Sequence, residues 1–502
     1  MNSVEKLKLA KDGLTLLDDL ERVASTDWQA LGADELQRLK WLGLFHRDPT
    51  PGRFMQRLRI THGFLTSNQA RAIARCAERF GSGVLDLTTR QQIQLRDLKL
   101  GDVPALFRLQ HSVGLHSMQT GMDNVRNVTG CPVAGLDARE FFDTRGIARE
   151  LSDQLAGNRA FSNLPRKFNL CLTGCRENCA HAETNDLGFV PAQRRRRSGA
   201  ELGFNLRAGG ALGGASPRFA TPLDVFVRAE EAVEIALRVL ELFRDEGPRE
   251  RRSHARLKVL LDAWGEERFR AELERRAGRA LERAAEEEFL GEGQNAHLGV
   301  HPQKQPGFHY VGLCVPVGRM QASHLAQLAD LSDRYGKGQL RLTVGQNVIV
   351  PHVAESRVPD LLAEPLLKEL PADPHPALAG LVACVGDDYC SYSTIDTKGL
   401  GLWLAAQVKD RLPAGAPARI HISGCPRGCG KHHVAQFGIL GGVMKCGGEL
   451  KPTADLFVGG ATGPQMRLGE KTAERLDWNE LPDLLVRLAA GELATALVLQ
   501  RV

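Results

Sequence analysis

The chain has 502 residues, of which 43% are hydrophobic and 25% charged, and its formal net charge is +5 at pH 7. This composition is typical of a globular protein with room for several domains, and it excludes a disordered or collagen-like chain. The small positive charge excludes wholesale nucleic-acid binding, although it favours an acidic partner.

The eleven cysteines are an odd number, and the chain opens with "MNSVEKLKLAKDGL". That opening has neither an apolar signal core nor an Arg-rich transit segment, so we expect a cytoplasmic protein with reduced thiols. No run reaches the roughly 18 apolar residues of a membrane span. The cysteines are therefore available for metal chemistry.

In chain order, the first strong pattern is an amphipathic helix over 67–81 that ends at glycine, followed by a β-rich segment over 85–95. The same order returns 255 positions later, at 322–336 and 340–350. Each half of the chain therefore begins with an α+β module.

A second repeat contains cysteines. "LTGCRENCAHAETNDLGFV" (172–190) matches "ISGCPRGCGKHHVAQFGIL" (422–440) 250 positions later in Gly-Cys, in the second Cys and in the late Gly. A strongly helical, highly charged stretch ends near residue 290, where we place the junction between the halves. The alternative interpretation of the repeat is a duplicated fold with no shared chemistry.

The repeats predict an α+β fold with an internally duplicated, pseudo-twofold core. Each half is a smaller α+β module followed by a larger α/β module. The expected segments are a helical extension, a first smaller module, a first larger module with a vestigial cysteine motif, a second smaller module and a second larger module, over residues 1–50, 51–120, 121–290, 291–370 and 371–502.

Four cysteines of the second half form two spaced pairs. Cys384 and Cys390 are C-x5-C, and Cys425 and Cys429 are C-x3-C, in a segment with three glycines. Together they supply four thiolates, the number that a cubane iron-sulfur cluster requires. A structural zinc site is the alternative, although zinc favours C-x2-4-C pairs.

The first half has an incomplete version of this pattern. It keeps the C-x3-C pair but shows a single Cys131 where the second half has C-x5-C. A second cluster remains open, and so does the interpretation of these residues as small buried hydrophobes. The candidates are Cys131, Cys171, Cys175 and Cys179.

Eight stretches in order carry a family resemblance: "GRFMQRLRI", "LDLTTRQQIQL", "GMDNVRNVTGCPVAGLD", "SNLPRKFN", "GVHPQKQPGFHYVGLCVPVGRMQA", "LRLTVGQNVIVPHV", "CVGDDYCSYSTIDTKG" and "RIHISGCPRGCGKHH". From about residue 50 onward, the sequence resembles the siroheme-dependent nitrite and sulfite reductases. The resemblance implies that in each half the smaller module is a ferredoxin-like half-domain and the larger one a cofactor-binding domain. It also implies that the four second-half cysteines hold a [4Fe-4S] cluster, and that the sulfur of Cys429 is also the axial ligand of the siroheme iron.

The same resemblance assigns cations and polar groups to the cofactor and the substrate. Arg427 departs from the family's Cys-Pro-Asn and adds a cation beside the siroheme, and Asp396 stands where Glu is usual. The residues expected at the siroheme edge are Arg57, Arg59, Arg166, Lys304, Gln346 and Asn347. Those expected around the substrate anion are Arg90, Arg126, Lys167 and Asn169.

The substrate preference is predicted from one motif. Sulfite reductases tend to show Lys-x-Lys where this chain has Lys167, Phe168 and Asn169, and a neutral Asn169 suits the single charge of nitrite. We therefore expect a six-electron reduction of nitrite to ammonia. The alternatives are sulfite reduction, oxidation of a precorrin on the same scaffold, and a non-catalytic zinc or cluster-stabilised scaffold.

The electron donor is expected to be external. No G-x-G-x-x-G opens a strand-turn-helix unit, so the chain shows no NAD(P)H or flavin module of its own. The family resemblance implies a small acidic ferredoxin, with flavodoxin as the alternative, and the sequence pI of about 8.6 suits such a donor. We expect a monomer.

Overall fold

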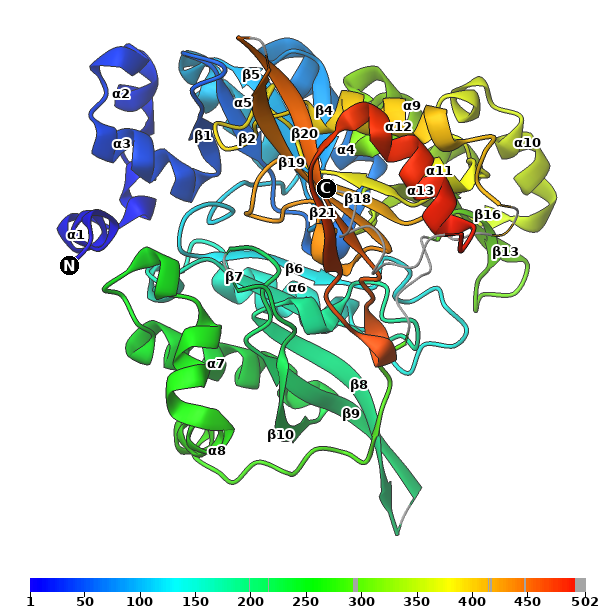
Figure 1. Ribbon diagram of the computed structural model, residues 1–502. Helices are drawn as coiled ribbons and strands as arrows, with labels where there is room; N and C mark the ends of the chain where they lie inside the picture. The colour runs from blue at the N-terminus through cyan, green and yellow to red at the C-terminus, as the bar shows by residue number, and fades with distance from the viewer. Residues whose placement is uncertain are drawn as a thin grey trace.

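The computed structural model describes residues 1–197, 199–214, 216–291, 297–413, 415, 418–446 and 448–492. The chain begins with short helices beside the first sheet: α1 (Ser3–Ala10), α2 (Leu20–Ser25) and α3 (Ala33–Arg38) (Figure 1). Asn2 caps α1, because its side chain accepts hydrogen bonds from the backbone N–H groups of Val4 and Glu5.

Two antiparallel five-stranded sheets come next, and they exchange strands. The first has the order β1-β2-β5-β4-β14 and the second the order β12-β13-β16-β15-β3, so each sheet is completed by a strand from the other half of the chain. Their strands are β1 (Leu44–His46), β2 (Phe54–Arg57), β3 (Phe64–Thr66), β4 (Val84–Leu87), β5 (Ile93–Leu98), β12 (Gly299–Pro302), β13 (Phe308–Leu313), β14 (Arg319–Gln321), β15 (Gln339–Leu342) and β16 (Val348–Ala354).

Helices pack on these sheets in matching positions. Thr66 and Gln69 form a capping box that starts α4, whose buried face shares one apolar core with the equivalent α9 of the second half. The helices are α4 (Ser67–Phe80), α5 (Val103–His111), α9 (Ala322–Tyr335) and α10 (Val358–Leu362). The boundaries of α4 and α9 differ by the 255 positions of the sequence repeat.

Two further sheets carry the cysteine loops, and both have the same strand order, β6-β7-β8-β9-β10 and β17-β18-β19-β20-β21. In each, the first three strands are parallel and the last pairs are antiparallel. The strands are β6 (Val125–Gly130), β7 (Phe168–Leu172), β8 (Leu187–Arg196), β9 (Gly199–Ala208), β10 (Thr221–Val227), β17 (Leu381–Ala383), β18 (Ile420–Ser423), β19 (Phe437–Cys446), β20 (Glu449–Val458) and β21 (Glu470–Asp477), with β11 (Glu287–Glu288) pairing with β8.

The remaining helices cover these two sheets. The long hairpins β8–β9 and β19–β20 project toward opposite ends of the molecule (Figure 1). The helices are α6 (Arg145–Leu155), α7 (Ala232–Glu246), α8 (Leu257–Ala277), α11 (Pro376–Ala379), α12 (Thr397–Val408) and α13 (Leu481–Ala489). The predicted α+β fold with an internally duplicated core is confirmed.

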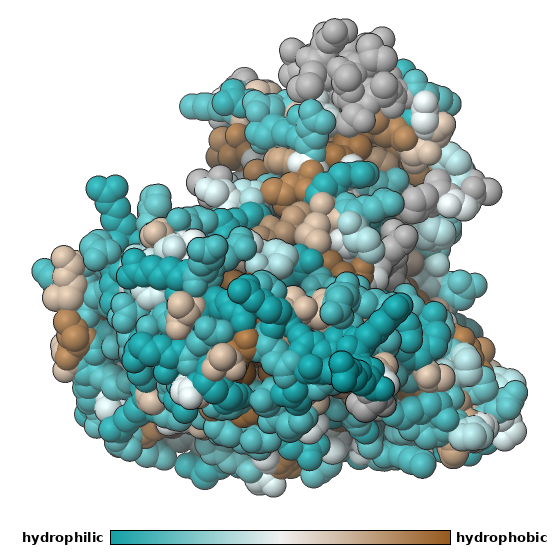
Figure 2. Space-filling model, turned by 90° about the horizontal axis from the view of Figure 1, so that it is seen from below, coloured by the Kyte–Doolittle hydropathy of each residue, from teal (hydrophilic) through white to brown (hydrophobic). Residues whose placement is uncertain are grey.

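The face of the molecule below the β6–β10 sheet is mostly hydrophilic (Figure 2). Ion pairs on α8 contribute to it, since Arg276 contacts Asp245 on α7 and Glu272 on its own helix. Within the described parts of the chain, every helix is too short or too polar to cross a membrane.

Candidate functional site

The four second-half cysteines follow two neighbouring parallel strands. Cys384 comes directly after β17, and Cys425 and Cys429 lie in the loop after β18. The carboxyl ends of parallel strands meet at one sheet edge, so these loops lie together, and the Cys384 N–H donates to the Ile422 carbonyl at 3.0 Å. Cys390 lies in the loop between Cys384 and α12.

This loop pair prepares sulfur for a cationic partner. The Gly424 N–H donates to Cys384 Sγ at 3.3 Å, and a Cβ at Gly424 would collide with Ser393 Oγ. Burial, with a smaller contribution from the charges of Cys429, Cys390 and Cys384, raises the pKa of Cys425 to about 11. A bound cation near these thiols would offset that effect.

A glycine-rich loop from the first half covers the cysteine loop. Gly214 N donates to the Pro426 carbonyl at 3.0 Å, and a Cβ at Gly213 would collide with the Arg427 carbonyl. Gly428 has a φ of 63°, and a Cβ there would collide with the Leu212 carbonyl. Side chains larger than glycine would therefore separate the two loops.

A cavity beside Cys429 lies between the two halves. The described residues that line it include no carboxylate, and Thr89 fixes one edge by donating to the Cys429 carbonyl at 3.2 Å. The family resemblance implies a siroheme with many carboxylates and an anionic substrate, and the charge of this wall suits both. Its cations are Arg90, Lys167, Arg256, Arg427 and Lys431.

A buried polar chain holds part of this wall in place. Arg90 Nε donates to Asn169 Oδ1 at 2.9 Å, and the Asn169 N–H donates to Asp186 at 2.7 Å. Asp186 in turn accepts two hydrogen bonds from Arg256, at 2.9 and 2.7 Å. This geometry fixes the Arg90 and Arg256 side chains and leaves Lys167 beside them.

Burial lowers the pKa of both lysines of the wall. Burial, followed by the charges of Arg256 and Arg90, keeps the pKa of Lys167 well below its ordinary value. Burial also lowers the pKa of Lys431 to about 8. A lysine with a pKa of about 8 can donate a proton near neutral pH and regain it from water.

The structure brings together five of the predicted residues and places others behind the wall. Arg90, Lys167, Asn169, Arg427 and Cys429 line the cavity. Two predicted arginines converge on one carbonyl, since Arg57 donates to Thr120 O at 3.1 Å and Arg126 at 3.3 Å.

The other predicted siroheme-edge cations make protein contacts. Arg59 is buried and donates to the Val125 carbonyl at 2.8 Å. Arg166 lies 3.7 Å from the buried Asp123. Lys304 pairs with Glu140 at 2.5 Å on the surface. None of these three lies among the described residues that line the cavity.

Gln346 and Asn347 are buried at the junction of the halves. Gln346 donates to the carbonyls of Leu87 and Ala383 at 2.8 and 3.1 Å and accepts from the Ala383 N–H. Asn347 Oδ1 accepts from the Val315 N–H at 3.0 Å. The bond to Leu87 joins the two halves, whereas the bonds to Ala383 and Val315 lie within the second half.

The two departures from the family motifs also have local contacts. The guanidinium of Arg427 lies 3.5 Å from the centre of the Tyr392 ring, a stacking that directs it along the cavity wall. Asp396 caps α12 by accepting from the N–H groups of Lys398 and Gly399.

Sequence reasoning missed Arg256 and Lys431. Lys431 stands two residues after Cys429 and could have been found from that spacing alone. Arg256 lies just before α8, far from every motif, and only the fold brings it to Asp186.

Comparisons with known proteins agree with this geometry. The family model described as "Nitrite and sulphite reductase 4Fe-4S domain" matches residues 121–281, and the "Nitrite/Sulfite reductase ferredoxin-like half domain" matches 46–112 and 301–368. The NirA protein of Mycobacterium tuberculosis has a TM-score of 0.91 and 27% identity, with 100% of this chain and 96% of that chain covered.

Curated relatives share most of their length with this chain. The ferredoxin–nitrite reductase of Synechococcus elongatus is 46% identical over 97% of this chain and 96% of its own. The chloroplastic ferredoxin–nitrite reductase of Zea mays is 42% identical over 97% and 89%, and the assimilatory ferredoxin-dependent nitrite reductase of Haloferax mediterranei is 37% identical over 95% and 86%.

The fold and site define a redox enzyme whose cofactors are siroheme and a [4Fe-4S] cluster. The chain belongs to the nitrite and sulfite reductase family. This membership confirms the resemblance that the eight sequence motifs predicted.

Proposed function

We propose that this chain is an assimilatory, ferredoxin-dependent nitrite reductase that converts nitrite to ammonia with six electrons. The observation that carries the proposal is the carboxylate-free cavity beside Cys429, which is lined by five cations from both halves. The names of the relatives at 37–46% identity support the same substrate and donor.

We propose that Cys384, Cys390, Cys425 and Cys429 ligate the cluster, with Cys429 shared by the siroheme. When bound, the cluster would deliver single electrons and the siroheme iron would bind the substrate nitrogen. Cys429 suits the shared role, because it is the exposed member of the four and borders the cavity. Arg57, Arg59, Arg166, Lys304, Gln346 and Asn347 remain predictions for the macrocycle edge.

The chain's own residues would orient and protonate the anion. Arg90 supplies a fixed positive charge whose direction is set by Asn169. Lys167, with its lowered pKa, would give protons to departing oxygens, and Arg126 would add positive potential from behind. Each lost oxygen leaves as water, so repeated proton delivery is required.

The test is turnover of the holoenzyme with reduced ferredoxin, following nitrite loss and ammonia formation. We expect six electrons per ammonia and a higher kcat/KM for nitrite than for sulfite. Arg90→Ala should lower kcat/KM for nitrite by about 10²-fold. Faster turnover of sulfite would replace the proposal with its main alternative.

Asn169→Lys sharpens the substrate assignment. The new ammonium would lie beside Arg90 and add charge for a dianion, so the nitrite-to-sulfite ratio of kcat/KM should fall at least tenfold. Gln154→Lys, on the exposed face of α6, adds the same charge elsewhere and is the matched control. An unchanged ratio in Asn169→Lys would remove this residue from substrate selection.

We further propose a cytoplasmic monomer. All ten cysteines whose side chains the structure describes are free, which suits a reducing compartment. Light scattering after size exclusion should give one chain of 54.9 kDa. Cell fractionation should recover the activity with cytoplasmic markers.

A further inference from the structure

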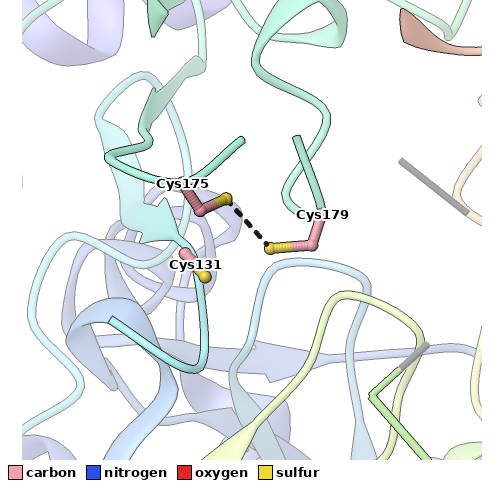
Figure 3. Close-up of side chains that lie close together, drawn as sticks. All are labelled: Cys131, Cys175 and Cys179. Atoms are coloured by element: carbon pink, nitrogen blue, oxygen red, sulfur yellow. Dashed lines mark hydrogen bonds between the residues drawn. The ribbon is translucent and has the colours of Figure 1, made fainter. Parts of the chain in front are cut away.

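Three buried thiols of the first half form a group that the reduction of nitrite does not use. The Sγ atoms of Cys131, Cys175 and Cys179 all lie within 4.8 Å of one another, and those of Cys175 and Cys179 are 3.7 Å apart. Their sulfurs point into one shared space (Figure 3). All three residues are at most 3% exposed.

The group is built like the cluster site of the second half. Cys131 follows β6 directly, Cys175 and Cys179 lie in the loop after β7, and these two strands are parallel neighbours. The sheet edge therefore gathers the cysteines of two loops, as β17 and β18 do. Cys171 is excluded, because its thiol lies within β7 and contacts the Ala180 carbonyl at 3.8 Å.

The spacing fits one metal ion. Two thiolates bound to the same tetrahedral zinc at about 2.3 Å lie about 3.8 Å apart, close to the observed 3.7 Å. The thiolates of a cubane bind separate irons at outer corners and lie farther apart. A disulfide needs an S–S distance of about 2.05 Å and would involve two of the three thiols.

A buried imidazole lies next to this group. His62 is fully buried, and neither of its ring nitrogens has a hydrogen-bond partner in the part of the chain that the structure describes. The ring packs on Gly130, the residue before Cys131, so closely that a Cβ there would collide with His62 Nε2. Unpartnered buried nitrogens are rare, and a metal bond would satisfy one of them.

We propose that Cys131, Cys175 and Cys179 bind a single zinc-class divalent ion. The His62 nitrogens lie outside the 4.8 Å group that the three sulfurs form, so the ring would turn toward the ion to become the fourth ligand. Such a closed four-ligand site is structural, since no position is left for substrate. It would tie the ends of β6 and β7 to the 61–63 turn of the first ferredoxin-like module. The ion would thus stabilise the first half at the place where the second half has its cluster.

The test uses the siroheme- and cluster-loaded protein after removal of loosely bound metal with EDTA. Elemental analysis should give about one zinc per chain, and zinc-edge X-ray absorption should show three sulfurs at about 2.3 Å and one imidazole nitrogen at about 2.0 Å. The spectrum of the wild-type protein tests the site even where a variant fails to fold.

Variants assign the ligands. Cys175→Ser should reduce the zinc content at least fivefold, whereas Cys171→Ser, a buried thiol outside the group, should retain it. His62→Gln should lose the imidazole scattering, and its persistence would overturn His62 as a ligand. Less than about 0.1 zinc per wild-type chain after growth with added zinc, or fewer than three sulfurs around the ion, would overturn the site.

Discussion

The two halves of this protein share one backbone arrangement but differ in the side chains of their cysteine loops. The loops after β7 and β18 both end in a short 3-10 turn that begins after a left-handed residue, His181 with φ of 56° and Lys431 with φ of 60°. In the first loop the thiols are buried, whereas in the second Cys429 is exposed at a cation-lined cavity. A duplicated backbone therefore fixes where a site can form, and a few side chains decide which site forms.

The exchanged strands also place different side chains at equivalent backbone positions in the core. Arg319 on β14 faces Asp86 on β4, and the two form an ion pair at 2.9 Å. At the equivalent place in the other sheet, Arg341 on β15 faces Phe64 on β3, with the guanidinium 3.7 Å from the ring centre. One pseudo-symmetric contact is ionic and the other is a cation–π pair.

The largest expected effect tests the functional difference between the halves. Cys429→Ser should lower the rate of nitrite turnover by more than about 10³-fold, because it would remove the sulfur proposed to join both cofactors. Visible absorption and iron content per chain report the loss directly.

Cys314→Ser is the control for that experiment. Cys314 is buried in the second half and lies outside both thiol groups, so the absorption spectrum should keep its shape and intensity. A Cys429→Ser protein that keeps full iron content and turnover would refute the shared-thiolate assignment.

The next effect compares the two core contacts. Although burial raises the pKa of Asp86, the charges of Arg96, Lys398 and Arg319 hold it below its usual range. Asp86→Asn leaves the buried Arg96 and Lys398 without their carboxylate, while Arg319 keeps Asp388, and it should cost about 3–5 kcal/mol of unfolding free energy.

Phe64→Leu is the matched change in the other sheet. It removes one cation–π pair and should cost about 1–2 kcal/mol. Urea unfolding of both variants gives the difference, and equal losses would mean that the ionic contact has no special weight.

Much of this organisation could be predicted from the sequence. The repeats at 255 and 250 positions predicted the duplicated α+β fold, because a repeated helix–strand order requires a repeated module. The strand exchange between β3 and β14 could not be predicted, since local periodicity does not say which sheet a strand joins. Arg256 was missed for the same reason, as its partner Asp186 is 70 positions away.

A third prediction concerns Gln91 and Gln346, which occupy equivalent left-handed turns. Gln91 donates to the carbonyls of Gly130 and Leu342, both at 3.0 Å, as Gln346 does to Ala383 and Leu87. Shortening either residue to Asn breaks these buried hydrogen bonds and should lower the unfolding free energy by about 2–3 kcal/mol. Asn tolerates the left-handed φ of these positions, so the backbone should not change.

The pair also tests the siroheme edge. Both variants should lower the Tm similarly, but only Gln346→Asn should lower the siroheme content if that residue also contacts the macrocycle. Equal siroheme content in Gln91→Asn and Gln346→Asn would restrict Gln346 to joining the halves.

The smallest effect concerns acid stability, and it too separates the halves. The His116 carbonyl accepts from the Arg59 N–H at 2.9 Å, and at the equivalent place the Pro371 carbonyl accepts from the Cys314 N–H at the same distance. Burial, together with a smaller effect of the Arg59 charge, lowers the pKa of His116 to about 4. Only the first half therefore has a titrating side chain here.

The sign of the effect follows from that lowered pKa. An unfolded histidine binds its proton near pH 6.5, so stability is full above that pH and is lost as the pH falls toward 4, by about 2 kcal/mol at pH 5. His116→Gln should reduce the fall in unfolding free energy between pH 7.5 and 5 by that amount, while the exposed His111→Gln should not. The same fall in all three proteins would show that acid lability arises elsewhere and that this pseudo-symmetric difference has no energetic consequence.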